Sequence, residues 1–570
     1  MKTVLKYMRP HLAIFLWCVF LKVFAAIADL QIPRMLAVII DEDIPSGDVT
    51  RVYRTGAIMI LFALTSLASN IGGNRISAHA VARFSRDLRR DLFVATMNLD
   101  TRSTDKFGLS SLTSRLTSDT YNVALFFGRL ARMGMRAPMI LVGGIITAFT
   151  LDYRLALLFV VVLPLVFATV TLITARAMPL YKKEQKTLDA LVRRVDETSS
   201  GIRVIKALSK VEYEKNKFNE TAKNLSDDEI KAGRVTSLTT PINDLIFYLG
   251  FSGVVVLGAV ITARYGEEMS GTLLAFMTYF TMILNSMLAM SRIFVQMSRA
   301  MASSDRIAEV FGEKSEMTVS AEEERDETAP FISFESVTFS YNGVAPNLKD
   351  ISFSLERGKT LGIIGGTGSG KSTLVNLLVR LYDPTEGRIR IDGRDLRAIP
   401  KEELHAMFGI AYQNDFIPRG SVAENIDFYR GIEEGELVRA SEIARAAEFI
   451  AELDGGMQYE VDTRGANLSG GQRQRLIISR AVAGSPAILI LDDSSSALDY
   501  KTDKELRTAI RRDIDTTTVI VSQRVASVRA ADLILVLDNG EIIGKGTHEE
   551  LMKTVPEYRD IAAVQMEVRE

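Results

Sequence analysis

Eight consecutive residues in the second half of the chain have the pattern of a phosphate-binding loop. The run Gly-Gly-Thr-Gly-Ser-Gly-Lys-Ser, at 365–372, fits G-x-x-x-x-G-K-[ST]. In such a loop the backbone N–H groups and the start of the next helix face the anionic phosphates of a nucleotide. Lys371 is expected to reach the outer phosphates, and Ser372 is expected to bind Mg²⁺. The predicted ATP-binding residues of this segment are Gly365, Gly366, Thr367, Gly368, Ser369, Gly370, Lys371, Ser372 and Thr373.

The runs of residues around this loop support the prediction. An apolar run at 360–364 feeds the loop, and residues 371–381 are expected to form the helix that follows it. Strand, loop and helix in this order are the context that a phosphate-binding loop requires. A second apolar strand, at 488–492, ends in Asp492, a carboxylate that suits the Mg²⁺ shell of a phosphate-loop ATPase. Further strands are expected at 331–334, 337–341 and 350–355.

The composition indicates a very apolar part joined to a charged part. A chain of 570 residues is too long for one ordinary core. Its mean hydropathy is +0.13 although 24% of its residues are charged. A net charge of −2 argues against a nucleic-acid partner. Cys18 is the only cysteine, which excludes an internal disulfide and a cysteine metal site, and the four histidines show no metal-ligand spacing.

The apolar part contains six candidate membrane spans, since a span needs about 20 mainly apolar residues. They lie at 12–38, 56–80, 135–151, 155–176, 238–262 and 272–298. Only Asp152-Tyr153-Arg154 separates the third span from the fourth, which predicts a tight turn at one membrane face. The first span follows basic residues, as a signal peptide does. It is long and lacks a clear small-residue cleavage site, so we interpret it as a retained helix.

The charged loops predict the orientation of the spans. The N-terminal residues and the segments 84–130 and 180–235 are basic, whereas acidic residues follow the first span. Basic loops stay in the cytoplasm, so the N-terminus and these segments are expected to be cytoplasmic, in a multi-pass protein of the cell membrane. Their helical periodicity predicts cytoplasmic extensions of the membrane helices, and two small soluble insertions are the alternative.

Several polar residues fall within the predicted spans, where burial of an ionisable group is costly. Lys22 and Asp29 are candidates for substrate contact, and a structural pair or snorkelling at a helix end is the alternative. The others are Asn70, Asn243, Asp244, Asn285, Arg292 and Gln296.

An acidic, turn-rich stretch separates the apolar part from the soluble part. It includes Glu322, Glu323, Glu324, Asp326 and Glu327 and ends at Pro330, which is typical of a solvated linker. We therefore predict a membrane α-helical domain at 1–312, a linker at 313–330 and an α/β phosphate-loop ATPase domain at 331–570.

A second motif makes a family resemblance specific. Leu468-Ser469-Gly470-Gly471-Gln472 resembles the signature motif of ABC transporters. Tyr341 resembles the aromatic residue that stacks on adenine, Gln413 the glutamine of the Q-loop, which also reaches Mg²⁺, and 496–499 the D-loop. Residues 199–207 resemble the cytoplasmic loops of the same family. With six spans before one nucleotide domain, the whole chain resembles an ABC exporter half-transporter, whose ATPase domain carries a helical subdomain.

This resemblance implies a partner, a second half-transporter in the same bilayer. In the family two nucleotide domains pair head to tail, with each ATP between the phosphate loop of one and the signature of the other. Ser469, Gly470, Gly471 and Gln472 are then expected to bind the ATP held by the partner. The transported substrate is expected to be a hydrophobic or amphipathic small molecule, lipid or peptide.

Two positions depart from the family pattern, and both concern hydrolysis. Asp493 stands where the family has the glutamate that polarises the attacking water, and Gln523 stands where it has a histidine that contacts the γ-phosphate. Both remain candidate catalytic residues, together with Gln413. Thr463 also replaces a glutamate of the loop before the signature. This combination resembles the degenerate-site subunit of heterodimeric bacterial multidrug exporters. The alternatives are tolerated drift in a working site, a homodimer with two slow sites, and an ATP-gated channel or regulatory subunit.

Overall fold

The computed structural model describes residues 2–265, 269–315, 317, 320–321, 323–326, 328–413, 416–494 and 496–567. Two compact units divide the chain. The helical unit comprises Met1–Asn98 and Gly108–Glu313, and the mixed unit comprises Leu99–Phe107 and Lys314–Glu570. The predicted linker lies at the start of the second part of the mixed unit. Its residues 316, 318, 319, 322 and 327 lie outside the described residues.

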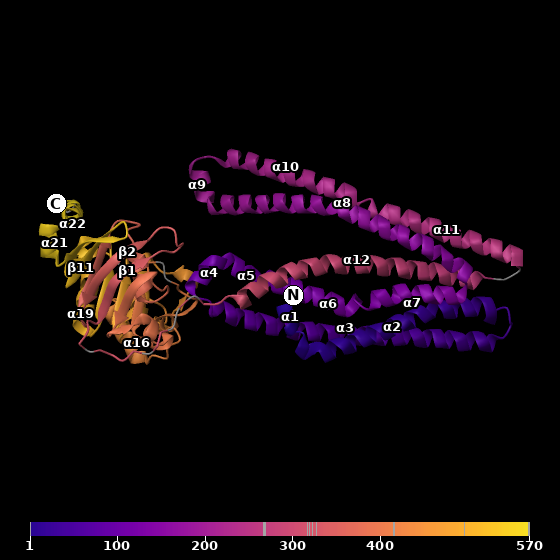
Figure 1. Cartoon of the computed structure of the whole chain (residues 1–570), viewed down its shortest axis with the longest axis horizontal. Helices are drawn as coiled ribbons and strands as arrows, with labels where there is room; N and C mark the ends of the chain where they lie inside the picture. Colours follow the sequence, from indigo (N-terminus) through magenta and orange to yellow (C-terminus); the bar gives the residue numbers. More distant parts are fainter. Residues whose placement is uncertain are drawn as a thin grey trace. The chain divides into compact units, whose positions relative to one another are not determined.

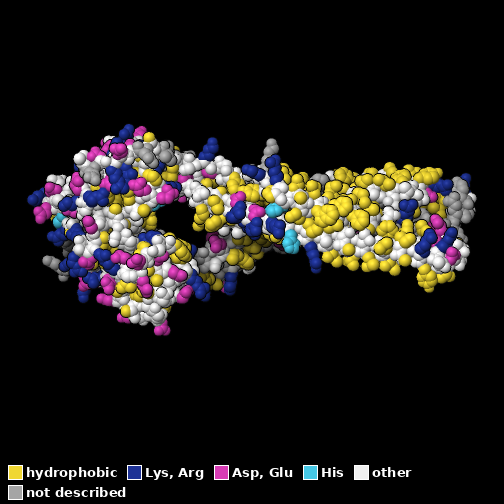
Figure 2. Space-filling view, turned by 90° about the horizontal axis from the view of Figure 1, so that it is seen from below, with side chains coloured by type: hydrophobic (Ala, Val, Ile, Leu, Met, Phe, Trp, Pro, Cys, Tyr) yellow, Lys and Arg dark blue, Asp and Glu magenta, His cyan; other side chains and the backbone are white. Residues whose placement is uncertain are grey.

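The helical unit supplies six segments that are long and apolar enough to cross a membrane within the described residues, as expected. Figure 2 shows apolar side chains covering much of its surface, as a lipid-facing surface requires. Its helices are α1 (Lys2–Lys6), α2 (Leu12–Val38), α3 (Val49–Met97), α5 (Leu109–Ser114), α6 (Thr120–Met133), α7 (Arg136–Leu151), α8 (Tyr153–Ser200), α9 (Ile202–Ala207), α10 (Val211–Thr236), α11 (Thr239–Tyr265) and α12 (Ser270–Gly312).

The helical periodicity of the two basic segments is confirmed. α8 continues from the fourth span to Ser200, and α10 leads back into α11, so that α8 and α10 run beside one another in Figure 1. The tight turn before α8 is confirmed as well. The Asp152 carboxylate caps α8, because it accepts hydrogen bonds from the N–H groups of Arg154 (2.7 Å) and Leu155 (3.1 Å).

Lys22 and Asp29, for which a structural pair was one of the alternatives, have separate partners in the helical unit. Lys22 donates to the side-chain oxygens of Asn70 (3.0 Å) and Asn74 (2.8 Å) on α3. Asp29 accepts from Ser66 on α3 and from Arg136 on α7 (2.8 Å). The direct pair is therefore wrong: each group satisfies its charge on a neighbouring helix, and the bonds hold α2, α3 and α7 together.

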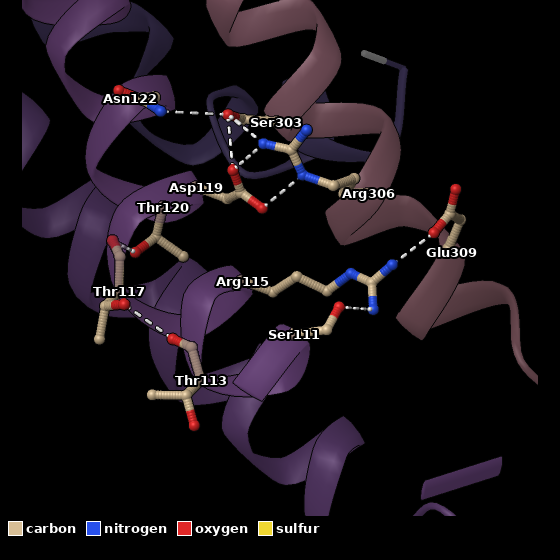
Figure 3. Close-up of polar contacts among 10 residues, drawn as sticks. All are labelled: Ser111, Thr113, Arg115, Thr117, Asp119, Thr120, Asn122, Ser303, Arg306 and Glu309. Atoms are coloured by element: carbon tan, nitrogen blue, oxygen red, sulfur yellow. Dashed lines mark hydrogen bonds and ion pairs between the residues drawn. The ribbon is translucent and has the colours of Figure 1, made fainter. Parts of the chain in front are cut away.

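A buried carboxylate fastens the start of α6 to α12 (Figure 3). Asp119 is 1% exposed and accepts from Arg306 through both of its oxygens, with the Arg306 Nε bond at 2.8 Å. Ser303 adds a third bond to Asp119 at 2.8 Å. Nearby, Arg115 pairs with Glu309 at 2.6 Å. Residues Arg115–Asp119 form a π-helical turn, and this local widening lets both side chains face α12.

The mixed unit is an α/β fold with two main sheets and a short ribbon. The six-stranded sheet has the order β12-β11-β3-β10-β9-β6, and the four-stranded sheet has the order β2-β1-β4-β5. Its strands are β1 (Ile332–Phe339), β2 (Leu348–Leu355), β3 (Thr360–Gly365), β4 (Glu386–Ile391), β5 (Arg394–Asp395), β6 (Phe408–Ala411), β7 (Gly420–Ser421), β8 (Glu460–Val461), β9 (Ile488–Asp492), β10 (Thr517–Val521), β11 (Leu533–Asp538) and β12 (Glu541–Gly546).

The helices of the mixed unit include a group between β7 and β9 whose buried faces share one core with the six-stranded sheet. The helices are α4 (Thr101–Phe107), α13 (Lys371–Leu378), α14 (Lys401–Ala406), α15 (Val422–Asp427), α16 (Glu434–Ile443), α17 (Ala447–Glu452), α18 (Gly470–Val482), α19 (Tyr500–Asp513), α20 (Val525–Val528), α21 (His548–Thr554) and α22 (Pro556–Glu567).

Two boundaries differ from the expected ones for local reasons. The runs at 331–334 and 337–341 form one strand, β1, whose register shifts around Ser336, a residue with φ of 46°. The helix after the phosphate loop ends at Leu378 rather than 381, because Arg380 adopts a left-handed conformation (φ 55°). The sequence also gave no sign that α4 belongs to the mixed unit, where Ser315 donates to Asp100 at 3.0 Å.

Replacing Asp119 by alanine is expected to destabilise the helical unit by about 3 kcal/mol. This is the lower end of the cost of removing one partner of a buried ion pair, because the Arg306 side chain is half exposed. Thermal unfolding of the purified protein in detergent measures the change. Asp196→Ala on α8, where the residue is exposed, is the matched control and should leave the unfolding temperature unchanged. Equal unfolding temperatures for both variants would contradict the role assigned to Asp119.

Candidate nucleotide site

The phosphate loop joins β3 to α13, and its backbone has no room for side chains at two glycines. A Cβ atom on Gly365 would lie 2.2 Å from the carbonyl oxygen of Leu537 on β11 and 2.6 Å from the Ser369 hydroxyl. Gly370 has φ of 100°, a left-handed conformation that glycine adopts without strain. These constraints keep the loop close to the sheet and leave the first N–H groups of α13 without intrahelical partners.

A cavity of about 300 Å³ lies against this loop and brings most of the predicted residues together. It is lined by Asn347, Thr367, Gly368, Gly370, Lys371, Ser372, Thr373, Gln413, Asp492, Asp493, Val521, Ser522 and Gln523. The predicted residues Gly365, Gly366, Ser369 and Tyr341 are not among the lining residues, and neither are Ser469–Gln472 of the signature.

Lys371 and two adjacent carboxylates set the electrostatics of the cavity. The Lys371 ammonium donates to the carbonyl oxygens of Gly365 (2.9 Å) and Gly366 (2.6 Å). Burial lowers its pKa, and the charges of Asp492 and Asp493 partly offset this effect. Burial also raises the pKa of Asp492, and the neighbouring charge of Asp493 raises it further. The cavity therefore holds carboxylate acceptors for a cation together with an ammonium donor for a phosphate.

The residues at the bottom of the cavity fit a Mg²⁺ ion. The Ser372 hydroxyl donates to the Asp492 carboxylate, and the Gln413 amide lines the same cavity. Hydroxyl, amide and carboxylate oxygens are the ligands that Mg²⁺ accepts, usually alongside water and phosphate. The described residues contain no group of three or more His, Cys, Asp and Glu side chains that could hold a metal alone. A bound Mg²⁺ would therefore need phosphate oxygens to complete its shell.

The two departing residues, Asp493 and Gln523, both reach this cavity. The Asp493 carboxylate lies 3.5 Å from the Gln413 side-chain nitrogen, which donates to it. Its backbone is left-handed (φ 46°), and its N–H donates to Val521 on β10 at 2.9 Å. Burial raises the pKa of Asp493, and Arg524 and Lys371 partly offset this effect. Gln523 follows β10 and is among the residues that line the cavity, and its side chain is a neutral amide.

Tyr341 lies beside the loop and connects it to α4. Its hydroxyl lies 3.4 Å from the Thr373 hydroxyl on α13. Its ring stands edge-on to that of Tyr382, with the centroids 5.1 Å apart. The Tyr382 hydroxyl donates to Asp105 on α4, and burial together with this carboxylate raises the Tyr382 pKa. Side-chain contacts thus run from the start of α13 to α4.

The signature motif is built as a helix N-terminus, as its sequence predicts. The Ser469 hydroxyl caps α18 by accepting from the Gln472 N–H at 3.3 Å, and the Gln472 side chain accepts from the Ser469 N–H at 2.8 Å. One turn later Gln474 fixes the D-loop, since it donates to Ser496 (3.0 Å) and accepts from the Ala497 N–H (2.8 Å). Such an N-terminus favours an anion.

Sequence reasoning missed Asn347 and Ser522, which also line the cavity. The Asn347 side chain accepts from the Tyr341 N–H at 3.1 Å, and the Ser522 hydroxyl accepts from the Arg524 N–H at 3.0 Å. Both act on the backbone of neighbouring residues. A single polar residue beside a strand carries no pattern that predicts such a contact.

Comparison with known proteins agrees with this architecture. Residues 15–287 match the family model of the ABC transporter transmembrane region, and residues 348–496 match the ABC transporter model. An uncharacterised ABC transporter ATP-binding protein of Mycobacterium tuberculosis is 33% identical over 568 residues, which cover 98% of this chain and 97% of that protein. The chain belongs to the ABC transporter family.

Further similarities define the kind of ABC transporter. An ATP-dependent lipid A-core flippase of Methylobacillus flagellatus is 28% identical over 96% of this chain and 94% of its own. The solved structure of a bacterial Atm1-family ABC exporter with ATP bound has the same fold, with a TM-score of 0.81 over 96% of this chain and 98% of that one, at 23% identity. This ABC exporter chain is a multi-pass half-transporter with an N-terminal transmembrane region and a C-terminal ATPase domain.

Replacing Gly365 by alanine is expected to weaken ATP binding by about tenfold or more. The added methyl group would collide with Leu537 and shift the loop backbone, and overpacking of this kind costs about 1–3 kcal/mol. Gly435→Ala on α16 is the matched control, because a Cβ there meets nothing within 4 Å and the residue does not line the cavity. Displacement of a fluorescent ATP analogue from the full-length exporter in Mg²⁺ measures both affinities. Similar losses in the two variants would contradict this steric account.

Proposed function

We propose that the chain is one subunit of a heterodimeric ABC exporter, with a slow ATP site of its own. In this arrangement its phosphate loop holds ATP with little turnover. Its signature motif completes the faster site, in which a second half-transporter supplies the phosphate loop, the glutamate and the histidine. The pair would export a hydrophobic or amphipathic substrate, a small molecule, lipid or peptide, from the cytoplasm or the inner leaflet.

The position of Asp493 and Gln523 on one cavity is the observation that carries this proposal. Aspartate places its carboxylate about 1–1.5 Å short of a glutamate on the same backbone. A misplacement of about 1 Å can cost about 10²-fold in rate. Gln523 offers a hydrogen bond to a γ-phosphate but cannot carry a proton or a charge. Both substitutions weaken the same hydrolytic step, while Lys371, Ser372 and Asp492 keep the groups that bind Mg²⁺ and phosphate.

The intact signature supports the second half of the proposal. Ser469 and Gln472 form a complete capping box at the start of α18. The signature motif therefore keeps a helix N-terminus that can bind the phosphates of an ATP held by the partner. None of these residues lines the cavity of the same chain, as a motif that serves another subunit would require.

The proposed location is the cell membrane, with the N-terminus and the ATPase domain in the cytoplasm. The basic segments at 84–130 and 180–235 support this orientation under the positive-inside rule. The relative named as a lipid A-core flippase supports a lipid or amphiphile as the substrate class.

Substitution of Ser469 is expected to reduce the ATPase activity of the two-subunit complex far more than Asp493→Asn. Ser469→Ala removes a ligand of the fast site, and we expect a loss of about tenfold or more. Asp493→Asn affects only the slow site, and we expect a change below about twofold. Steady-state phosphate release from the reconstituted pair measures both, and Ser354→Ala, an exposed serine on β2, is the matched control.

Equal or reversed losses in this comparison would defeat the assignment of the fast site to the partner. Purification of the chain alone provides a second check. Rapid, substrate-stimulated ATPase activity of the lone chain would instead support a homodimer.

A further inference from the structure

The C-terminal helix α22 makes direct contact with the segment that carries Gln523. We call Ser522–Val525 the switch segment. The side-chain amide nitrogen of Gln565 donates to the carbonyl oxygen of Gln523 at 2.9 Å. The amide oxygen of the same side chain accepts from the Val525 N–H at 2.8 Å. One side chain from 40–42 residues away thus bridges two backbone groups on either side of Arg524.

The helix that carries Gln565 is firmly anchored in the mixed unit. Tyr558 and Ala562 are fully buried in the core that also contains Val525 and Val528 of α20. The Tyr558 hydroxyl lies 2.8 Å from the Nδ1 atom of His548 on α21. Residues spaced four and then three apart lie on the same face of a helix, so Tyr558, Ala562 and Gln565 all face this core. Gln565 therefore reaches the switch segment from a fixed base.

The switch segment needs an external partner at its C-terminal end. At its start, the Ser522 N–H donates to Ile363 on β3 at 3.1 Å, which ties the segment to the sheet. At its end, α20 begins at Val525, whose N–H has no acceptor within a helix of four residues. Arg524, the N-cap residue, supplies no side-chain cap. The Gln565 oxygen fills this position, and its nitrogen fixes the preceding carbonyl.

We propose that Gln565 is a positioning residue of the nucleotide site, which holds the switch segment so that Gln523 stays directed into the ATP cavity. The Ser522 N–H, which donates to Ile363, and the Gln523 carbonyl, which accepts from Gln565, lie on either side of the Cα atom from which the Gln523 side chain projects. With both groups fixed, the backbone on either side of the Gln523 Cα is restricted, so that Gln523 remains on the wall of the cavity that it lines with Lys371. The C-terminal helix is then part of the ATP site, although it contributes no atom to the cavity.

The chemistry of glutamine explains why this residue type is needed. Its amide supplies one acceptor and two donors at fixed separation, so it can bridge a carbonyl and an N–H. A glutamate would still accept from the Val525 N–H, but it would place a second oxygen against the Gln523 carbonyl. An alanine would lose both bonds. Comparison of glutamine, glutamate and alanine at position 565 therefore distinguishes the capping of α20 from the fixation of the Gln523 carbonyl.

A double-mutant cycle between Gln565 and Gln523 tests the proposal in the full-length exporter with Mg²⁺. The readout is the preference for ATP over ADP, measured by displacement of a fluorescent ATP analogue, which requires no hydrolysis. The inference rests on the proposed contact of Gln523 with the γ-phosphate, so Gln523→Ala is expected to lower this preference by about threefold to tenfold. Gln565→Ala should cause a similar loss, and the double variant should lose no more than either single one.

Amide hydrogen exchange and a control variant complete the design. Gln565→Ala should speed exchange at 523–525, whereas Gln565→Glu should keep Val525 protected and still lower the ATP preference. Val564→Ala on the same helix, where the side chain is 63% exposed, should change neither quantity.

The outcomes distinguish the γ-phosphate contact of Gln523 from the positioning role of Gln565. An unchanged ATP preference in Gln523→Ala overturns the γ-phosphate contact, and with it the role of Gln565. A loss in Gln523→Ala without one in Gln565→Ala overturns the inference alone. Additive losses, or equal weakening of ATP and ADP together with a lower unfolding temperature, would show that Gln565 only stabilises the fold.

Discussion

The parallel register of three central strands is the constraint on which the nucleotide site depends. β3, β10 and β9 pair so that Ile363 lies opposite Val521, and Val521 lies opposite Asp492. Because the three strands end at the same edge, the phosphate loop, the switch segment and the two carboxylates leave the sheet side by side. A slip of one residue in β9 would turn Asp492 to the other face of the sheet. All five residues at 488–492 are buried, and Asp492 is the only charged one among them, so such a slip would leave its carboxylate among apolar side chains.

This arrangement also explains why the site should take its nucleotide and metal together. The charges of Asp492 and Asp493 act on Lys371, and Arg524 adds a second cation near Asp493. ATP alone would bring its negative phosphates beside the two carboxylates, whereas a bound Mg²⁺ would neutralise charge on both partners. The Asp493 carboxylate reaches the Gln413 side chain only at 3.5 Å, so the short aspartate stem has little margin for placing an attacking water. Under the proposed function, binding would survive a substitution that hydrolysis does not tolerate.

The sequence predicted those parts of the molecule that depend on local pattern. The phosphate loop, the strand ending in Asp492 and the six apolar spans follow from spacing and periodicity within short windows, and the structure has them. Contacts between distant segments carry no such signal. The bridge from Gln565 to the switch segment spans 42 residues, and the bond from Tyr382 to Asp105 spans 277. The alternative of a Lys22–Asp29 pair was wrong for the same reason, because each side chain bonds to residues on other helices.

The contacts from Thr373 through Tyr341 and Tyr382 to Asp105 would connect a nucleotide on the phosphate loop to α4. An adenine stacked on Tyr341 would restrict a ring that already stands against Tyr382, and so would hold Asp105 in place. Under the proposed function, ATP remains at this site through many cycles of the other one. The contacts between the ATP site and α4 would then persist in this subunit, while the corresponding contacts in the partner subunit form and break with each cycle. Asymmetry in two side chains of the ATP site would thereby become asymmetry in the mechanical contacts of the whole transporter.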